Sequence, residues 1–146
     1  MSTLFWNAIA GYYSRKPIAN PGAYQVKLLQ TREYLTRSSR VLEFGCGTGS
    51  TALTHAPHVA SILAVDTSRR MIEIASAKAE DQGVDNVAFE LGTVFDVEEE
   101  PFDVVLGLNV LHLVDDMSAT LRRCHALLRP GGILIASTAC IEGGLE

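Results

Sequence analysis

Residues 41–50 read VLEFGCGTGS, a strand-like run followed by three glycines at alternate positions, Gly45, Gly47 and Gly49. A helical pattern begins directly afterwards. Glycine is needed where a ligand approaches the backbone closely or where a turn requires a positive φ. We therefore predict a strand, a ligand-binding loop and a helix, which together form one unit of a parallel α/β sheet. The alternative is a glycine turn that only lets the strand and the helix pack.

The acidic residue Glu43 indicates the charge of the ligand. The spacing E-x-G-x-G-x-G differs from the dinucleotide pattern G-x-G-x-x-G, and Ser50 stands at the place of that pattern's last small residue. A carboxylate beside the loop repels a pyrophosphate, whereas it attracts an ammonium or a sulfonium group. The loop therefore favours a cationic ligand that carries no phosphate.

Short strand-like runs alternate with longer helical ones after residue 38, which is typical of a parallel α/β sheet. Thr67 or Ser68 is the expected N-cap of the second helix in this region, and the third helix ends before Pro130. We predict strands at 40–45, 61–66, 87–91, 103–108 and 132–138, and helices at 50–57, 67–82 and 117–128.

The second predicted strand ends in Asp66. An acid at this place lies where a ribose diol would sit beside the first loop. The alternative role is capping of the following helix, since aspartate is also a good N-cap residue. We expect Asp66 to bind ribose hydroxyls.

Two further helices are predicted before the sheet, at 4–14 and 21–36, with residues 16–20 between them. Most of the aromatic side chains lie in this part of the chain. We expect residues 1–38 to form a helical cap and residues 39–146 to form the core, the two together making one compact domain.

The composition excludes several classes of function. The net charge is −5, and residues 1–40 carry six Lys or Arg against one acid, so the remainder carries about −10. An acidic body argues against a nucleic-acid groove. The cysteines Cys46, Cys124 and Cys140 form no pattern of a disulfide framework or a zinc site. No apolar run approaches the ~20 residues of a membrane span, so we expect a cytoplasmic protein.

The chain resembles the class I methyltransferases that use S-adenosylmethionine (SAM), over roughly residues 38–140. Four features match in order, namely VLEFGCGTG, the acid in AVDTS, the strand FDVV followed by NVLH, and LRPGG. The resemblance implies a Rossmann-like, doubly wound and mainly parallel sheet with strand order 3-2-1-4-5. The family sheet usually ends with two more strands, which we expect to be absent here.

The resemblance also implies how SAM is held. In the family the first loop holds the methionine part, the acid after the second strand holds the ribose, and the segment after the third strand flanks adenine. That segment often carries an aspartate after its glycine, whereas here Thr93 follows Gly92. The cofactor-binding residues so implied are Glu43, Gly45, Cys46, Gly47, Gly49, Asp66, Thr67, Met71, Thr93, Val94 and Asn109.

Candidates for the acceptor side lie in the predicted cap and after the fourth strand. Tyr12, Tyr13 and Lys27 are candidates to meet the SAM carboxylate or an anionic acceptor, because they offer hydrogen-bond donors and a charge. The alternative is that the aromatic residues pack the helices on the core and the cations are solvated. His112 is a candidate general base for a hydroxyl or an acidic carbon, or else only lines the pocket.

These features predict a methyltransferase that acts on an unidentified acceptor, with a small molecule favoured. The segment NVLH (residues 109–112) replaces the N/D-P-P-[YFW] segment of amino-directed DNA methyltransferases. A non-catalytic module that binds SAM or a partner is one alternative, and an oxidoreductase that uses NAD(P) is another. We expect no metal site, and we expect a homodimer through an uncovered sheet edge.

Overall fold

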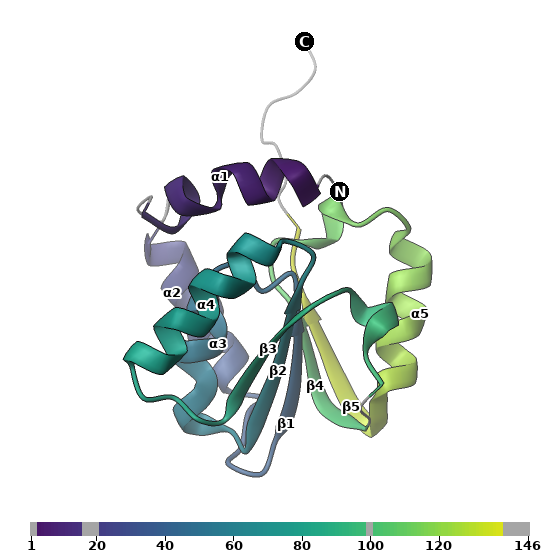
Figure 1. The fold of residues 1–146 in the computed structure, drawn as a ribbon. Helices are drawn as coiled ribbons and strands as arrows, with labels where there is room; N and C mark the ends of the chain where they lie inside the picture. Colours follow the sequence, from purple (N-terminus) through teal and green to yellow (C-terminus); the bar gives the residue numbers. More distant parts are fainter. Residues whose placement is uncertain (1–2, 16–20, 99–100, 139–146) are drawn as a thin grey trace.

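The computed structural model describes residues 3–15, 21–98 and 101–138, and its centre is a five-stranded sheet of order β3-β2-β1-β4-β5 (Figure 1). All four strand pairs are parallel. The predicted fold class and strand order are therefore confirmed. The strands are β1 (Arg40–Phe44), β2 (Ser61–Asp66), β3 (Val87–Leu91), β4 (Phe102–Gly107) and β5 (Leu128–Ala136).

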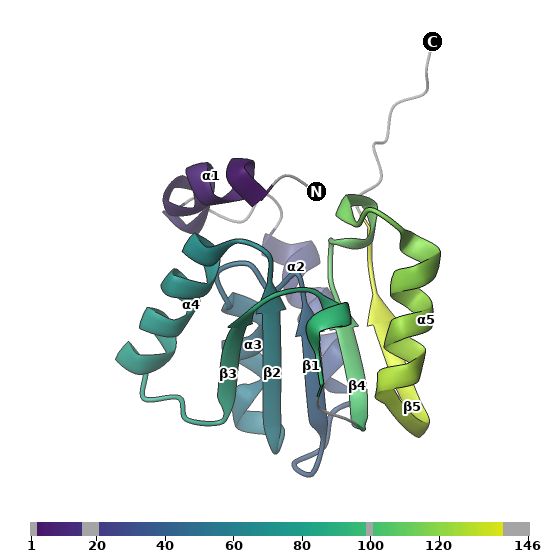
Figure 2. The same cartoon turned by 45° about the vertical axis from the view of Figure 1, so that its right-hand side comes forward.

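Helices cover both faces of the sheet, as a doubly wound fold requires. The helices α3 (Ser50–His55) and α4 (Arg69–Asp81) cover one face, where Ala52 and Ile72 pack on β1 and β2. The helix α5 (Met117–Leu127) covers the other face through Cys124 and Leu127 (Figure 2). Because both faces are buried, β1, β2 and β4 consist of nearly continuous apolar runs.

The helix starts follow capping chemistry. The Ser68 hydroxyl caps α4 by accepting from the Met71 backbone N–H, so the second predicted cap is confirmed. Asp116 caps α5 in the same way. Short 3-10 turns follow at Ala56–His58 (η1), Val94–Asp96 (η2) and Leu111–Leu113 (η3). The first of these replaces the end of the helix predicted at 50–57.

Two predicted element bounds are wrong by four residues. The helix α2 (Pro21–Arg32) ends four residues before 36, because the Thr36 N–H turns to the Ser39 hydroxyl instead. The last strand begins at Leu128 rather than 132, since Leu128 pairs with Phe102 before the register shifts at the segment 129–132. Such a shift leaves no periodic signal in the sequence.

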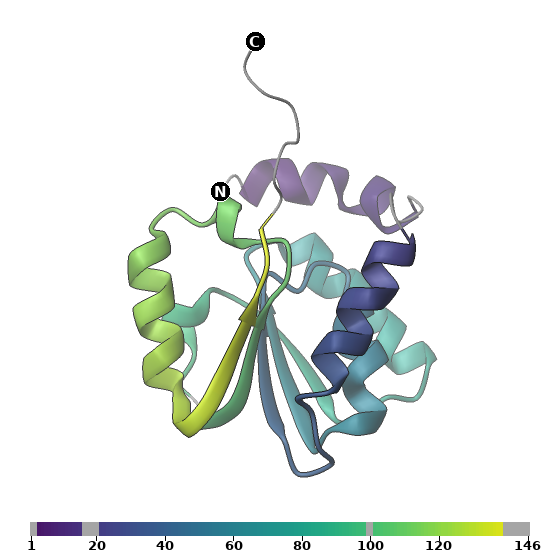
Figure 3. The same cartoon turned by 180° about the vertical axis from the view of Figure 1, so that it is seen from behind.

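The helix α1 (Thr3–Arg15) lies across the carboxyl ends of the strands, above the sheet in each view (Figures 1 and 2). It packs against α4. The helix α2 lies on the same face as α3 (Figure 3), and the Tyr24 and Thr51 hydroxyls join the two at 2.9 Å. The predicted connection 16–20 lies outside the described residues. Among the helices that are described, none is long and apolar enough to cross a membrane.

Candidate functional site

The three glycines of the loop after β1 have different neighbours. All have positive φ, at +63° for Gly45, +56° for Gly47 and +83° for Gly49. A Cβ on Gly45 would lie 2.3 Å from the Val110 side chain, and one on Gly49 would lie 2.7 Å from the Phe89 ring. A Cβ on Gly47 would meet no atom within 4 Å. Packing therefore explains the outer two glycines, whereas Gly47 faces open space.

Asp66, at the end of β2, holds the glycine loop in place. One of its carboxylate oxygens accepts from the Gly47 N–H and the other from the Ser68 N–H, each at 2.9 Å. The Cys46 N–H donates to the Val65 carbonyl at 3.0 Å. Burial raises the pKa of Asp66, and the N–H groups bound to it act in the opposite direction. The carboxylate therefore joins the tips of β1 and β2.

Glu43 is buried beside this loop without a partner. Its side chain is 3 % exposed, and neither carboxylate oxygen accepts a hydrogen bond from the described residues. Burial, and secondly the charge of Asp66, raises the pKa of Glu43 to about 8. Burial also raises the pKa of the Cys46 thiol, together with these two carboxylates. Since buried polar groups are nearly always paired, Glu43 points to a missing cationic or hydrogen-bonding group.

The two residues predicted beyond Asp66 differ in their surroundings. The Thr67 hydroxyl oxygen is buried and has no hydrogen-bond partner in the described part of the chain. Met71 is 2 % exposed in the first turn of α4. Thr67 therefore offers a polar group next to Asp66, whereas Met71 packs in the interior.

The loop after β3 lies beside the tip of β2, because the Gly92 N–H donates to the Asp66 carbonyl at 2.9 Å. Thr93 caps η2, and its N–H donates to the Asp96 carboxylate at 2.8 Å. The Val94 side chain is buried in the core. Arg123 on α5 donates to the Val94 and Val97 carbonyls, at 3.2 and 2.7 Å, and so ties this loop to α5.

Asn109 follows β4 and is the one non-glycine residue with positive φ, at 58°, in the part of the chain that the structure describes. Its backbone N–H donates to the Ser137 hydroxyl at 2.8 Å, while its side chain is exposed. Asparagine tolerates this conformation better than most residues. The tips of β4 and β5 are thereby joined, with Asn109 projecting from the carboxyl edge of the sheet.

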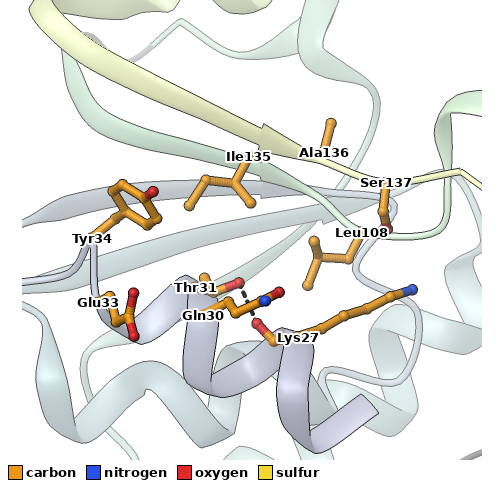
Figure 4. Close-up of a pocket in the computed structure, with 9 residues that line it drawn as sticks. All are labelled: Lys27, Gln30, Thr31, Glu33, Tyr34, Leu108, Ile135, Ala136 and Ser137. Atoms are coloured by element: carbon orange, nitrogen blue, oxygen red, sulfur yellow. Dashed lines mark hydrogen bonds between the residues drawn. The ribbon is translucent and has the colours of Figure 1, made fainter. Parts of the chain in front are cut away.

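The remaining predicted residues belong to other elements than Glu43 and Asp66 do. Lys27 lines a cavity of about 430 Å³ between α2 and the ends of β4 and β5, with Leu108 and Ser137 (Figure 4). His112 is exposed in η3. Tyr12 and Tyr13 belong to α1, but their side chains lie outside the described residues. The structure thus brings together Glu43, Gly47 and Asp66, and places Lys27 on another element.

His55 is a further buried titratable residue, and it belongs to α3 rather than to the glycine loop. It is 1 % exposed at the end of α3, and neither ring nitrogen has a hydrogen-bond partner among the described residues. Burial, followed by the charges of His58 and Arg32, lowers the pKa of His55 to about 4. The described residues contain no group of three His, Cys, Asp or Glu side chains that would hold a metal.

Two contacts at the site were not anticipated from the sequence. Asn7 on α1 accepts hydrogen bonds from the start of α4, and Arg123 holds the loop after β3. The available signal for Asn7 was a polar residue within the largely apolar run LFWNAIA (residues 4–10). Nothing in the pattern around Arg123 marks it, because its partners are backbone carbonyls 26 and 29 residues away.

Residues 42–134 match the family model described as a methyltransferase domain. The chain is 38% identical over 101 residues to a ubiquinone biosynthesis O-methyltransferase of Methylocella silvestris, covering 68% of this chain and 39% of that protein. It is 34% identical over 95 residues to the uncharacterized methyltransferase YcgJ of Bacillus subtilis, covering 64% of this chain and 38% of YcgJ. The chain therefore spans about two fifths of the length of these curated relatives.

Solved structures show the same architecture. A SAM-dependent methyltransferase from Thiobacillus denitrificans, in complex with S-adenosylhomocysteine (SAH), superposes with a TM-score of 0.72 at 26% identity. The match covers 93% of this chain and 55% of that protein. Together with the family model, the sheet order and the glycine loop, these likenesses show that the chain belongs to the class I SAM-dependent methyltransferase family.

Proposed function

We propose that this chain binds SAM at the tips of β1, β2, β3 and β4 and transfers the methyl group to a small-molecule acceptor. The observation that carries the proposal is the buried, unpartnered carboxyl group of Glu43 beside the open space at Gly47. A phosphate-bearing ligand would place negative charge next to Glu43 and Asp66, whereas SAM brings two cationic groups. The residues present therefore fit SAM, and they disfavour a dinucleotide.

Each part of the site has a proposed task. Glu43 and the loop Gly45–Gly49 hold the methionine part, with Cys46 at the base of the loop. Asp66 accepts hydrogen bonds from the ribose hydroxyls, and the Thr67 hydroxyl lies ready as a further partner. Thr93 and the Val94 backbone flank adenine. Asn109 faces the methionine part from the tip of β4, which its left-handed backbone conformation supports.

SAM supplies a methyl group already activated on a sulfonium, so the protein has mainly to orient the reactants and exclude water. Glu43 and Asp66 would orient SAM from the tips of β1 and β2. The helix α1 lies across the carboxyl ends of the strands (Figure 1), and it is proposed to cover the site. We therefore extend the proposal to residues 1–38 as a helical cap over a core of residues 39–146.

The acceptor is proposed to be a small molecule methylated on oxygen. The chain is 38% identical to a protein named as an O-methyltransferase of ubiquinone biosynthesis, which supports a hydroxyl acceptor. His112 follows β4 and is exposed at the same edge of the sheet, so it is the proposed base for such a hydroxyl. Lys27 is proposed to meet an anionic group of the acceptor from its cavity (Figure 4).

Among the described strands, β5 pairs only with β4, so its outer edge is available to a second copy. We propose a homodimer through this edge. A purely monomeric mass by light scattering at micromolar concentration would contradict the dimer.

The test of the cofactor site is calorimetric titration of the chain with SAH, with NADH as the competing ligand. We expect SAH to bind and NADH not to bind. The Gly47→Arg variant fills the open space above the loop and is expected to lose SAH binding. Tight NADH binding without SAH binding would overturn the proposal, and retained circular dichroism of the variant is the control for folding.

A further inference from the structure

Asn7, on α1, contacts the start of α4 at a distance of 61 to 63 residues along the chain. Its side-chain oxygen accepts from the Ser68 hydroxyl at 2.6 Å and from the Arg70 backbone N–H at 3.1 Å. It therefore satisfies an N–H group that the first turn of a helix leaves without an intrahelical partner. Asn7 extends the cap of α4 from another helix.

Ser68 carries this contact into the candidate cofactor site. The serine is fully buried, and its hydroxyl also accepts from the Met71 N–H at 3.2 Å. The Ser68 N–H donates to one Asp66 oxygen, and the other Asp66 oxygen accepts from the Gly47 N–H. A continuous chain of hydrogen bonds thus leads from α1 to the open glycine of the loop.

The described apolar side chains of α1 are for the most part incompletely buried. Among its apolar side chains that the structure describes, Ala10 is fully buried, Trp6 and Ile9 are half-buried, and Leu4 and Phe5 are exposed. Ala10 contributes little apolar area because it carries a single methyl group. The hydrogen bonds of Asn7 therefore add to a partial apolar contact, and without Asn7 the buried Ser68 hydroxyl would have no acceptor among the described residues.

We propose that Asn7 couples the docking of α1 to occupation of the cofactor site, through Ser68 and Asp66. This inference rests on the proposed binding of SAM. Asn7 is a positioning residue, because it acts on the site through Ser68. Linkage makes the coupling reciprocal, so a bound donor favours the docked position of α1 and a docked α1 raises the affinity for the donor.

The test compares Asn7→Ala, Asn7→Asp and the control Ala8→Ser, whose position is exposed on the same helix. The readouts are the dissociation constant of SAH by calorimetry and the fluorescence of Trp6, the single tryptophan of the chain. Trp6 is the neighbour of Asn7 and reports on the surroundings of α1 without any need for an acceptor.

We expect Asn7→Ala to weaken SAH binding about tenfold, as the net loss of one or two hydrogen bonds implies. The SAH-induced change in Trp6 fluorescence is expected to shrink with it. Asn7→Asp keeps an acceptor oxygen at the N-terminus of α4, where a negative charge is favourable, so it is expected to bind within threefold of the wild type. Ala8→Ser is expected to match the wild type.

The outcomes separate this inference from the function on which it rests. Failure of the wild-type chain to bind SAH would overturn the proposed function and the coupling with it. Equal SAH affinity of the wild type and Asn7→Ala would overturn the coupling alone, even if the variant melts at a lower temperature. Loss of affinity in Asn7→Ala with recovery in Asn7→Asp would support it.

Discussion

Replacing Glu43 by glutamine is expected to remove a loss of stability that the wild-type chain undergoes as the pH rises. The pKa of Glu43 is raised from 4.5 to about 8 in the folded chain. The folded state therefore binds more protons than the unfolded state between pH 4.5 and about 8. The contribution of this group to stability is fully present below pH 4.5 and is lost as the pH rises to about 8.

The window from pH 6.5 to 8 isolates the effect of Glu43. The pKa of the buried His55 is lowered from 6.5 to about 4 on folding, so most of the change in its contribution to stability occurs below this window. One pKa unit corresponds to about 1.4 kcal/mol, and a folded pKa of about 8 gives a loss of about 1.5 kcal/mol from pH 6.5 to 8. With a urea slope of about 2 kcal/mol per molar, the unfolding midpoint falls by close to 1 M.

The assay is urea unfolding of the wild type and Glu43→Gln, followed by circular dichroism at pH 6.5, 7.25 and 8. Glutamine keeps the size of the side chain and does not titrate, so its midpoint is expected to stay nearly constant. The slope across pH is compared rather than the absolute stability, because a buried amide without a partner also costs stability. Equal slopes for the two proteins would refute the proposed state of Glu43.

Three further outcomes are expected. His55→Gln will reduce the fall in stability between pH 6.5 and about 4, because the lowered pKa of His55 costs the wild type roughly 3 kcal/mol over that range. An unchanged fall in stability in urea unfolding would contradict this. Gly49→Ala will destabilise the chain by more than about 3 kcal/mol, because the new methyl group meets Phe89 and Ala75, whereas Gly47→Ala will cost about 1–2 kcal/mol for its backbone conformation alone. Thermal melting that ranks the two variants in the other order would contradict the packing role of Gly49. Arg123→Met will weaken SAH binding several-fold by releasing the loop after β3, and Arg122→Met, at an exposed position of the same helix, is the matched control. Equal affinities of the two variants in calorimetry would contradict this role of Arg123.

The sheet was largely predictable from the sequence because its signals are local. The strands at 61–66 and 87–91 coincide with β2 and β3, since β-prone runs there are bounded by polar turns. The start of β5 was not predictable, because Leu128 joins the sheet by pairing with Phe102 across a register shift. The end of α2 depends on the Ser39 hydroxyl, a competitor that helical periodicity does not include.

The site was predictable to the extent that residue type and position carry its chemistry. The glycine spacing and Asp66 marked the loop, but the sequence did not separate Gly47 from the two glycines that serve packing. Nor did it show that Glu43 lacks a partner, because this depends on which groups the fold leaves nearby. Asn7 was missed for a related reason, since its partners lie more than sixty residues away.

The measurement that tests the central claim most directly is a titration of the wild-type chain with SAH at pH 7, in two buffers of different ionisation enthalpy. SAH carries an ammonium group, and a cation beside Glu43 favours the ionised carboxylate. Since the pKa of free Glu43 is about 8, binding is expected to release most of one proton in the wild type and none from this site in Glu43→Gln. Absence of binding, or binding with no difference in proton release between the two proteins, would contradict the account.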